Sequence, residues 1–293
     1  MTSVRAALSM FINPLPHREA ALLLAHTLGQ SREWVLAHPE AELTPEQGER
    51  FAKLVEQAEH GVPLPYLLGQ WEFFGLNFKI TPDVLIPRPE TELLVEKAIV
   101  ISEQWAVNSE REQGTGDGSL FTVVDVGTGS GIIAVTLAVK LPHAHIVATD
   151  ISAAALDVAR ANAVAHGVAN RVQFIHGDLL EGVDKVNLIC ANLPYIPTAE
   201  LETLPVARHE PALALDGGPD GLRVIERLLA TAGDHLLPGG ALLAETAATQ
   251  GKAAASLACH YFPSARVEVH KDLAGLDRLL LIEMHNSQFS MRN

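Results

Sequence analysis

A regular alternation of apolar, β-rich runs with helical segments begins near residue 120 and constrains the fold more than any other feature. The runs are FTVVDVG, HIVATD, RVQFIHG, VNLICA, GALLAET, RVEVHK and DRLLLIEM. Such alternation is typical of a mostly parallel sheet that helices cover on both faces. The sequence therefore predicts an α/β fold, in which ligands bind outside the carboxyl ends of the strands.

The chain before this region has a helical character. HREAALLLAHTLG places apolar side chains on one broad face, and Thr44 and Gln47 have the spacing of a capping box with Pro45 at the first helical position. We expect a small helical domain over residues 1–66. This domain could dock a partner or serve only as a structural cap, and the residues leave both open.

Residues 67–86 are expected to link the two domains. Within them, QWEFFGLNFKIT at 70–81 alternates around Gly75, which is typical of a hairpin. The α/β domain is assigned to residues 87–293, so the hairpin would precede it.

The first part of the α/β domain combines a predicted helix with a predicted loop. VLIPRPETELLVEKAIV runs from an extended segment into a helix, with Pro89 near its first turn. The polar, glycine-rich stretch AVNSEREQGTGDGS at 106–119 is predicted to be a flexible loop.

Composition narrows the classes of function. The chain has 293 residues, a net charge of −14 and 48% hydrophobic residues. It contains no uncharged apolar run of about 18 residues, so we predict no membrane span. The N-terminus lacks a basic region followed by a long apolar stretch and a small-residue cleavage site, so we predict no signal peptide. The negative charge disfavours nucleic acid, because affinity for that polymer comes largely from neutralising its phosphates. The chain has only two cysteines, Cys190 and Cys259, which lie far apart in the sequence, and this favours a reducing cytoplasm. Neither the cysteines nor the scattered histidines have the spacing of metal ligands.

Acidic residues follow three consecutive strand runs, at Asp125, Asp150 and Asp178, and the first of them opens the loop DVGTGSG. The glycines let a ligand approach the backbone, and Asp150 could accept hydrogen bonds from both ribose hydroxyls. Asp178 or Leu179 could meet an adenine ring. One such Asp could be a mere turn or helix cap, but the set predicts a nucleoside site. Its acidity and the lack of a P-loop lysine favour a cationic ligand such as S-adenosylmethionine.

The fourth run ends in Asn192, Leu193, Pro194 and Tyr195. A planar amide or amino nitrogen is a poor nucleophile because its lone pair is delocalised. The Asn192 side-chain oxygen and the Leu193 carbonyl could accept its two N–H groups, while Pro194 fixes the turn and Tyr195 stacks on the planar group. This arrangement would align the nitrogen for methylation, at about 3–3.5 Å from the reacting carbon. A simple turn cap at Asn192 is the alternative.

These motifs together resemble class I methyltransferases that act on amide or exocyclic amino nitrogens. The segments VLIPRPETELLVE (84–96), HEPALALDGGPDGL (209–222) and KDLAGLDRLL (271–280) narrow the resemblance to the HemK/PrmC family, the glutamine methyltransferases of class 1 peptide chain release factors. The resemblance spans roughly residues 61–284. It implies a Rossmann-like, seven-stranded, S-adenosylmethionine-dependent methyltransferase domain behind a small N-terminal helical domain.

The resemblance also implies an activity and its residues. A methyl group would pass from S-adenosylmethionine, leaving S-adenosylhomocysteine, to the glutamine amide nitrogen in the Gly-Gly-Gln motif of the release factor. The helical domain would grip the release factor, and Arg88 and Glu90 would help close the site or only start a helix. The residues that would bind the cofactor are Asp125, Val126, Gly127, Thr128, Gly129, Asp150, Asp178, Leu179 and Asn192. The residues that would hold the substrate amide are Asn192, Leu193, Pro194 and Tyr195, and the catalytic role would fall to Asn192, Pro194 and Tyr195.

One position departs from the family pattern, because Leu193 stands where the family usually has proline, and one φ restraint is lost. Three other functions stay open: a glutamine methyltransferase of a ribosomal protein, a nucleic-acid amino methyltransferase, and a nucleoside-binding scaffold without catalysis. The net charge disfavours the second, and the intact Asn192 and Tyr195 disfavour the third. We expect a cytoplasmic monomer that binds neither nucleic acid nor a membrane.

Overall fold

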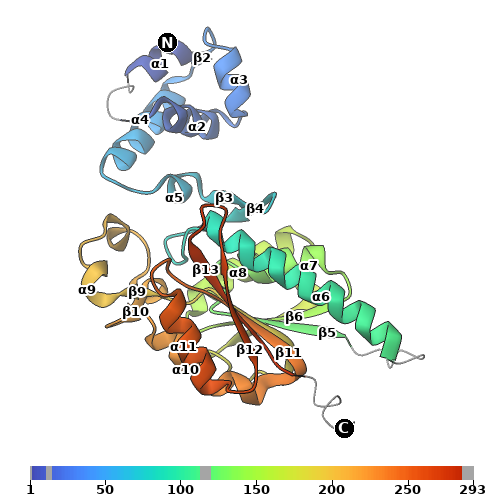
Figure 1. The fold of residues 1–293 in the computed structure, drawn as a ribbon. Coiled ribbons are helices and arrows are strands. Elements are labelled where there is room, and N and C mark those ends of the chain that lie inside the picture. The colour runs from blue at the N-terminus through green and yellow to red at the C-terminus, as the bar shows by residue number, and fades with distance from the viewer. Residues whose placement is uncertain (1, 11–14, 113–119, 286–293) are drawn as a thin grey trace, which may run out of the picture. The chain divides into compact units, whose positions relative to one another are not determined.

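The structure is a computed structural model, and it describes residues 2–10, 15–112 and 120–285. The pattern of contacts divides the chain into two compact units, Met1–Trp71 and Glu72–Asn293. Each unit has its own buried core, so each is described by itself (Figure 1).

The N-terminal unit is helical, as the sequence predicted. Its elements are α1 (Val4–Met10), α2 (His17–Leu28), α3 (Arg32–Ala37), α4 (Pro45–Glu59) and α5 (Leu64–Leu68), with a short antiparallel pair of β1 (Thr2–Ser3) and β2 (Glu42–Leu43). The capping box at the start of α4 is present: the Gln47 backbone N–H donates to Thr44 Oγ1 over 3.2 Å, and the Thr44 N–H donates to Gln47 Oε1 over 2.9 Å. Such a cap stabilises a helix by about 1 kcal/mol.

A hairpin follows, which confirms the prediction for residues 70–81. Its strands are β3 (Gln70–Phe73) and β4 (Leu76–Lys79). The backbone of Lys79 is held by the side chain of Asn162 on α8 (Ala153–Ala165), through contacts of 2.7 Å from the Lys79 N–H and 3.0 Å to its carbonyl. The second strand of the hairpin is therefore packed against the α/β unit.

The centre of the second unit is a seven-stranded sheet in the order β12-β13-β11-β8-β5-β6-β7. All seven predicted runs are strands, and only β13 is antiparallel to its neighbours. Their bounds are β5 (Phe121–Val126), β6 (Ala144–Asp150), β7 (Val172–His176), β8 (Val186–Ala191), β11 (Leu236–Glu245), β12 (Arg266–Lys271) and β13 (Asp277–Glu283). The predicted α/β class and seven-stranded sheet are confirmed.

Helices cover both faces of this sheet (Figure 1). The helices α6 (Glu92–Glu112), α7 (Ile132–Lys140) and α8 pack beside one another on one face, and α10 (Arg223–His235) and α11 (Gly251–Tyr261) pack on the other. The smaller elements are η1 (Pro89–Thr91), η2 (Ala169–Arg171), β9 (Ile196–Pro197), α9 (Thr198–Leu201), η3 (Pro205–Arg208), η4 (Ala212–Ala214) and β10 (Asp216–Gly218). Buried Val, Ile, Leu and Ala side chains from β5, β8 and β11 fill the interior, which explains why these runs are almost wholly apolar.

The loop predicted at 106–119 is wrong for residues 106–112. Helix α6 continues to Glu112, so residues 106–112 are helical, and residues 113–119 lie outside the described part. The stretch AVNSERE is polar but contains neither glycine nor proline, and its Ala, Glu and Arg residues favour helix. Polarity alone was a poor criterion for a loop here.

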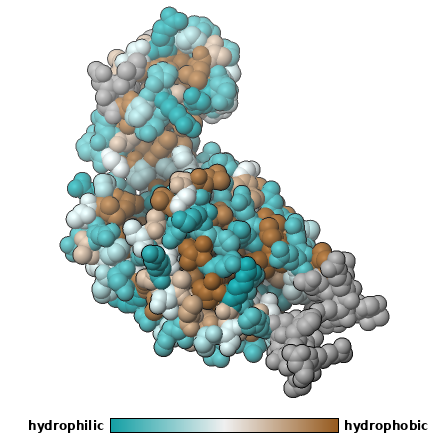
Figure 2. Space-filling model, viewed as in Figure 1, coloured by the Kyte–Doolittle hydropathy of each residue, from teal (hydrophilic) through white to brown (hydrophobic). Residues whose placement is uncertain are grey.

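The surface and the cysteines give few further constraints. Hydrophilic residues interrupt the hydrophobic ones on the face of the second unit seen in Figure 2. No helix in the described ranges has the length and apolarity needed to cross a membrane. Cys190 is buried, Cys259 is exposed, and both are free thiols. The described residues include no group of His, Cys, Asp and Glu that could hold a metal ion.

The order of the strands determines where a ligand can bind. The chain moves outward from β5 to β6 and β7 on one side, and continues to β8 and β11 on the other. The direction therefore reverses between β5 and β8, whose last residues, Val126 and Ala191, are paired in register. In open α/β sheets the crevice beyond such a reversal is the usual binding site.

Candidate functional site

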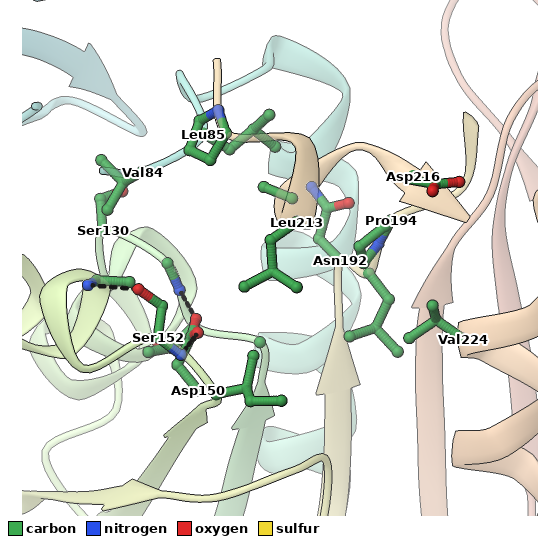
Figure 3. A pocket seen from close by; sticks show the side chains of 18 of the residues that line it. Val84, Leu85, Ser130, Asp150, Ser152, Asn192, Pro194, Leu213, Asp216 and Val224 are labelled. Atoms are coloured by element: carbon green, nitrogen blue, oxygen red, sulfur yellow. Dashed lines mark hydrogen bonds between the residues drawn. The ribbon is translucent and has the colours of Figure 1, made fainter. Parts of the chain in front are cut away.

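A cavity of about 520 Å³ lies at this reversal, within the range of small-molecule sites. Segments from both halves of the sheet form its wall: 83–88, the glycine loop, the ends of β6 and β8, the segment 211–214 and one side of α10. In Figure 3, Asp150 and Ser152 lie at one end of the cavity and Asn192 and Pro194 at the other. The predicted residues in the wall are Gly127, Thr128, Gly129, Asp150, Asp178, Leu179, Asn192, Leu193 and Pro194.

The glycine loop turns through left-handed backbone conformations. Gly127 has φ 71° and Gly129 has φ 56°, values that L side chains rarely adopt. A Cβ on Gly127 would lie 2.9 Å from Leu193 Cδ2, whereas a Cβ on Gly129 would meet no atom within 4 Å. Gly127 thus lets two loops touch, and Gly129 leaves its backbone open to a ligand.

Asp125 lies beneath the loop rather than in the cavity wall. Its Oδ2 accepts hydrogen bonds from Thr128 Oγ1 at 2.6 Å and from the Ala134 N–H at 3.1 Å, which ties the loop to helix α7. Burial raises the pKa of this carboxyl to about 7, although both hydrogen bonds lower it. Val126 is equally buried, and neither residue lines the cavity. Direct contact of these two residues with a ligand remains a prediction, which this placement does not favour.

Asp150 ends β6 and stands in the wall as predicted. Its Oδ2 accepts the Gly129 N–H and its Oδ1 accepts the Ser152 N–H, both at 2.8 Å (Figure 3). Burial raises the pKa of this carboxyl, and the two backbone hydrogen bonds lower it. A carboxylate has about four acceptor positions, so each Asp150 oxygen can still accept a hydroxyl proton from a ligand.

Asp178 and Leu179 follow β7. The Asp178 carboxylate forms an ion pair with Arg227 on α10, and both side chains are partly exposed. Leu179 has φ 53°, a conformation that is uncommon for a residue with a branched side chain. Its carbonyl accepts the Thr149 hydroxyl at 2.7 Å, which holds this backbone in place. A strained residue in a cavity wall is a frequent mark of a functional site.

The turn after β8 is held by a chain of side-chain hydrogen bonds. Asn192 Nδ2 donates to Thr91 Oγ1 over 3.0 Å, and Thr91 Oγ1 donates to Glu245 Oε2 over 2.7 Å. Tyr195 Oη donates to the other oxygen of Glu245 over 3.2 Å. Pro194 lines the cavity, whereas Tyr195 is absent from its wall. The predicted stacking of Tyr195 on a substrate is therefore not evident in this arrangement and remains a prediction.

The backbone of Tyr195 is fixed as well. Its carbonyl accepts Gln250 Nε2 at 2.8 Å. A Cβ on Gly221 would approach that carbonyl oxygen to 2.2 Å and Gln250 Nε2 to 2.4 Å, so only glycine fits there. This contact gives a physical reason for the glycine in the DGGPDG segment.

A second buried carboxylate joins two walls of the cavity. Glu210 accepts the Ile86 N–H at 3.0 Å and Arg88 Nη2 at 2.5 Å. Arg88 lines the cavity; Glu90 does not, and it lies 3.8 Å from Arg278. Sequence reasoning quoted both segments but did not single out Glu210 or its bonds to Ile86 and Arg88, because a bond across 124 positions leaves no local pattern.

Two family models match the chain. The model described as "PrmC N-terminal domain" matches residues 3–69, and the one described as "Methyltransferase small domain" matches residues 117–208. The first match covers the helical unit, and the second covers the glycine loop, the end of β6 and the Asn192 turn.

Two relatives match nearly the whole chain. The release factor glutamine methyltransferase of Moorella thermoacetica is 44% identical over 91% of this chain and 90% of its own length. The protein of the same name from Bordetella pertussis is 40% identical over 90% of this chain and 94% of its own.

Among solved structures, a methyltransferase from Pyrococcus furiosus is similar in fold. Its TM-score is 0.51 at 17% identity, with 73% of this chain and 91% of that chain covered. At this identity the likeness concerns the fold alone.

Proposed function

Since the chain belongs to the family of release factor glutamine methyltransferases, we propose that it methylates the glutamine side-chain amide nitrogen in the Gly-Gly-Gln motif of class 1 peptide chain release factors. The methyl donor is S-adenosylmethionine. The observation that carries this proposal is the position of Asn192, which lines the same cavity as the glycine loop and Asp150. The residue expected to hold the substrate amide and the residues expected to bind the nucleoside therefore line the same cavity.

The residues of the cavity fit this cofactor. Gly129 leaves open backbone, and Asp150 keeps acceptor positions for the two ribose hydroxyls. Leu179 offers an apolar surface for the adenine ring, next to Asp178. When bound, the cofactor supplies an electrophilic methyl group on a positively charged sulfur. Of the arginines in the cavity wall, Arg88 is paired with Glu210 and Arg227 with Asp178, which offsets their charge.

The Asn192 turn supplies the geometry for the reaction. The substrate amide donates one N–H to Asn192 Oδ1 and the other to the Leu193 carbonyl, so one face of its nitrogen points to the methyl group. Each neutral hydrogen bond contributes about 1 kcal/mol net, and alignment at about 3–3.5 Å contributes several more. The nitrogen loses its proton to water after methylation, so no strong general base is required.

The rest of the chain suits a protein substrate. We assign the grip on the release factor body to the N-terminal helical domain, residues 1–66, which the PrmC N-terminal match covers from residue 3 onward. The net charge of −14 supports a monomer that does not bind nucleic acid directly. We place the protein in the cytoplasm, because its release-factor substrate acts in translation there.

The experiment is a peptide map of the reaction product. Unmethylated release factor is incubated with the protein and S-adenosylmethionine, digested, and sequenced by tandem mass spectrometry. One added methyl group on the glutamine of the Gly-Gly-Gln peptide is expected. Methylation of another residue, or methylation of a ribosomal protein in a parallel reaction while the release factor stays unmethylated, would refute the proposal.

A further inference from the structure

We propose that Glu245 is a positioning residue of this reaction: through Thr91 it fixes which atom of the Asn192 side chain faces the substrate. The inference rests on the proposed function, because it concerns how Asn192 meets the substrate amide. Glu245 does not line the cavity, so it acts through its neighbours.

The count of protons fixes the direction of the hydrogen bonds. A carboxylate only accepts, and a hydroxyl has one proton. Thr91 therefore donates its proton to Glu245 Oε2, over 2.7 Å, and can only accept from Asn192. Asn192 must then turn its NH₂ group to Thr91, over 3.0 Å, which leaves Oδ1 for the cavity.

The orientation decides whether the substrate can bind productively. The reacting nitrogen of a glutamine carries two N–H groups and needs acceptors. Asn192 Oδ1 is such an acceptor, whereas a reversed Asn192 would present its own NH₂ group to the substrate NH₂. Two donors would then face each other, and the substrate nitrogen would lose its alignment.

Burial makes this device rigid. Thr91 is 0% exposed and Glu245 is 3% exposed, so no water competes for their hydrogen bonds. Glu245 also accepts the Tyr195 hydroxyl, over 3.2 Å. One carboxylate thus anchors both ends of the turn from Asn192 to Tyr195.

The sheet explains how three distant segments meet. Ala244 on β11 is paired in register with Ala191 on β8, so Glu245 ends its strand beside Asn192. Thr91, in η1, reaches the same point from the segment that precedes α6.

The charged state of Glu245 follows from its neighbours. Burial first, and then the charge of Glu90 on η1, raise the pKa of its carboxyl, and the net effect of all its neighbours is a pKa of about 7. Hydrogen bonds from Thr91 and Tyr195, and the charge of Arg278 on β13, lower it. Below this pKa a protonated Glu245 can itself donate, and Thr91 is no longer forced to accept from Asn192. Turnover should therefore rise with pH through about 7 and then level off.

The test compares four variants of the full chain in one release-factor assay: Glu245→Gln, Thr91→Val, Thr91→Ser and, as control, Glu226→Gln on the outer side of α10. In Glu245→Gln, a carboxamide NH₂ can donate to Thr91, which then donates to Asn192 Oδ1 and reverses the amide. Thr91→Val keeps the shape and removes the hydroxyl, whereas Thr91→Ser keeps the hydroxyl.

We expect kcat to fall at least about tenfold in Glu245→Gln and Thr91→Val, as is usual when the support of a functional side chain is removed. Thr91→Ser and Glu226→Gln should stay within about threefold, and cofactor affinity should stay within about threefold throughout. A fifth protein, which combines Glu245→Gln with Thr91→Val, should be no worse than the poorer of these two single variants, because the two residues act as one unit. The rise of turnover through pH 7 should be lost or weakened in Glu245→Gln.

Wild-type activity separates the two possible failures. If the wild-type protein does not methylate the release factor, the proposed function fails. If wild type is active and Glu245→Gln and Thr91→Val match it, or lose cofactor affinity as much as kcat, the positioning role of Glu245 is refuted.

Discussion

The backbone of Gly127 and the side chain of Leu193 meet at the floor of the crevice between β5 and β8: a Cβ on Gly127 would lie 2.9 Å from Leu193 Cδ2. Leu193 is only 4% exposed and belongs to the apolar core beneath the site. The glycine loop and the Asn192 turn are therefore packed against each other. Where the family usually has proline, this chain places a side chain that ties the two loops together.

Substitution of Gly127 should impair cofactor binding. In Gly127→Ala the new Cβ meets Leu193, and a non-glycine residue must adopt φ 71°. We expect the Kd for S-adenosylmethionine to rise at least about tenfold, measured by isothermal titration calorimetry. The matched control is Gly48→Ala in helix α4, where the Cβ meets nothing within 4 Å and helix propensity favours Ala by about 1 kcal/mol. Equal affinities in the two variants would mean that the loop does not form the site.

Removal of the Asn192 side chain should separate turnover from cofactor binding. In Asn192→Ala the substrate amide loses its acceptor, while Asp150 and the glycine loop are untouched. We predict that kcat falls by about 100-fold or more and that cofactor affinity changes by no more than a few-fold, using Asn170→Ala at an exposed position as the control. Unchanged turnover would show that the amide-holding role of Asn192 is wrong.

Replacement of Asp150 should weaken cofactor binding, in contrast to replacement of Asn192. In Asp150→Ala the cavity loses the carboxylate expected to hold the ribose, and the N–H groups of Gly129 and Ser152 lose their acceptor. The Kd for the cofactor should rise at least about tenfold in calorimetry. Asp157→Ala, which removes an exposed carboxylate on α8, should leave the Kd unchanged. A Kd that stays at the wild-type value in Asp150→Ala would remove Asp150 from the site.

The pH dependence of stability should reveal the buried carboxyl of Asp125. Its pKa is about 7 in the folded protein against an ordinary 3.8, so the folded state binds this proton more tightly than the unfolded state. The free energy of unfolding should therefore decrease as pH rises from about 4 to about 7, and this contribution should be constant above that range. Urea unfolding at several pH values should show a shallower decrease in Asp125→Asn. Identical slopes in the two proteins would contradict an elevated pKa at Asp125.

The helical unit should matter for the protein substrate and little for the cofactor. A chain that starts at Gln70 lacks the region that matches the PrmC N-terminal domain but keeps the whole cavity wall. Its kcat/KM for release factor should fall at least about tenfold, while calorimetry gives a near wild-type Kd for S-adenosylmethionine. A parallel loss of both would indicate that the helical unit supports the fold and does not grip the substrate.

Much of the fold was predictable because its signals are local. The runs of β5, β8 and β11 are almost wholly apolar because these strands are covered on both faces, and the capping box at Thr44 needs only residues three apart. That Gly127 and Asn192 would line one cavity followed from a general rule, because the carboxyl ends of parallel strands lie at one edge of the sheet.

The parts that escaped prediction depend on non-local contacts. Thr91 reads as an ordinary residue near the start of a helix, and its hydroxyl gains a role only from Glu245, 154 positions later. Glu245 itself was within reach of the strand-end rule, since it is the last residue of β11. The helical residues 106–112 were missed because their polarity outweighed the absence of glycine and proline.

The most direct test of the account is transfer of a labelled methyl group from S-adenosylmethionine to purified, unmethylated class 1 release factor. A release factor whose Gly-Gly-Gln is changed to Gly-Gly-Ala serves as the control substrate. The account predicts label on the first protein and none on the second, and Asn192→Ala should label the first about 100-fold more slowly or worse. Equal labelling of both substrates, or no labelling of either by a protein that binds the cofactor, would contradict it.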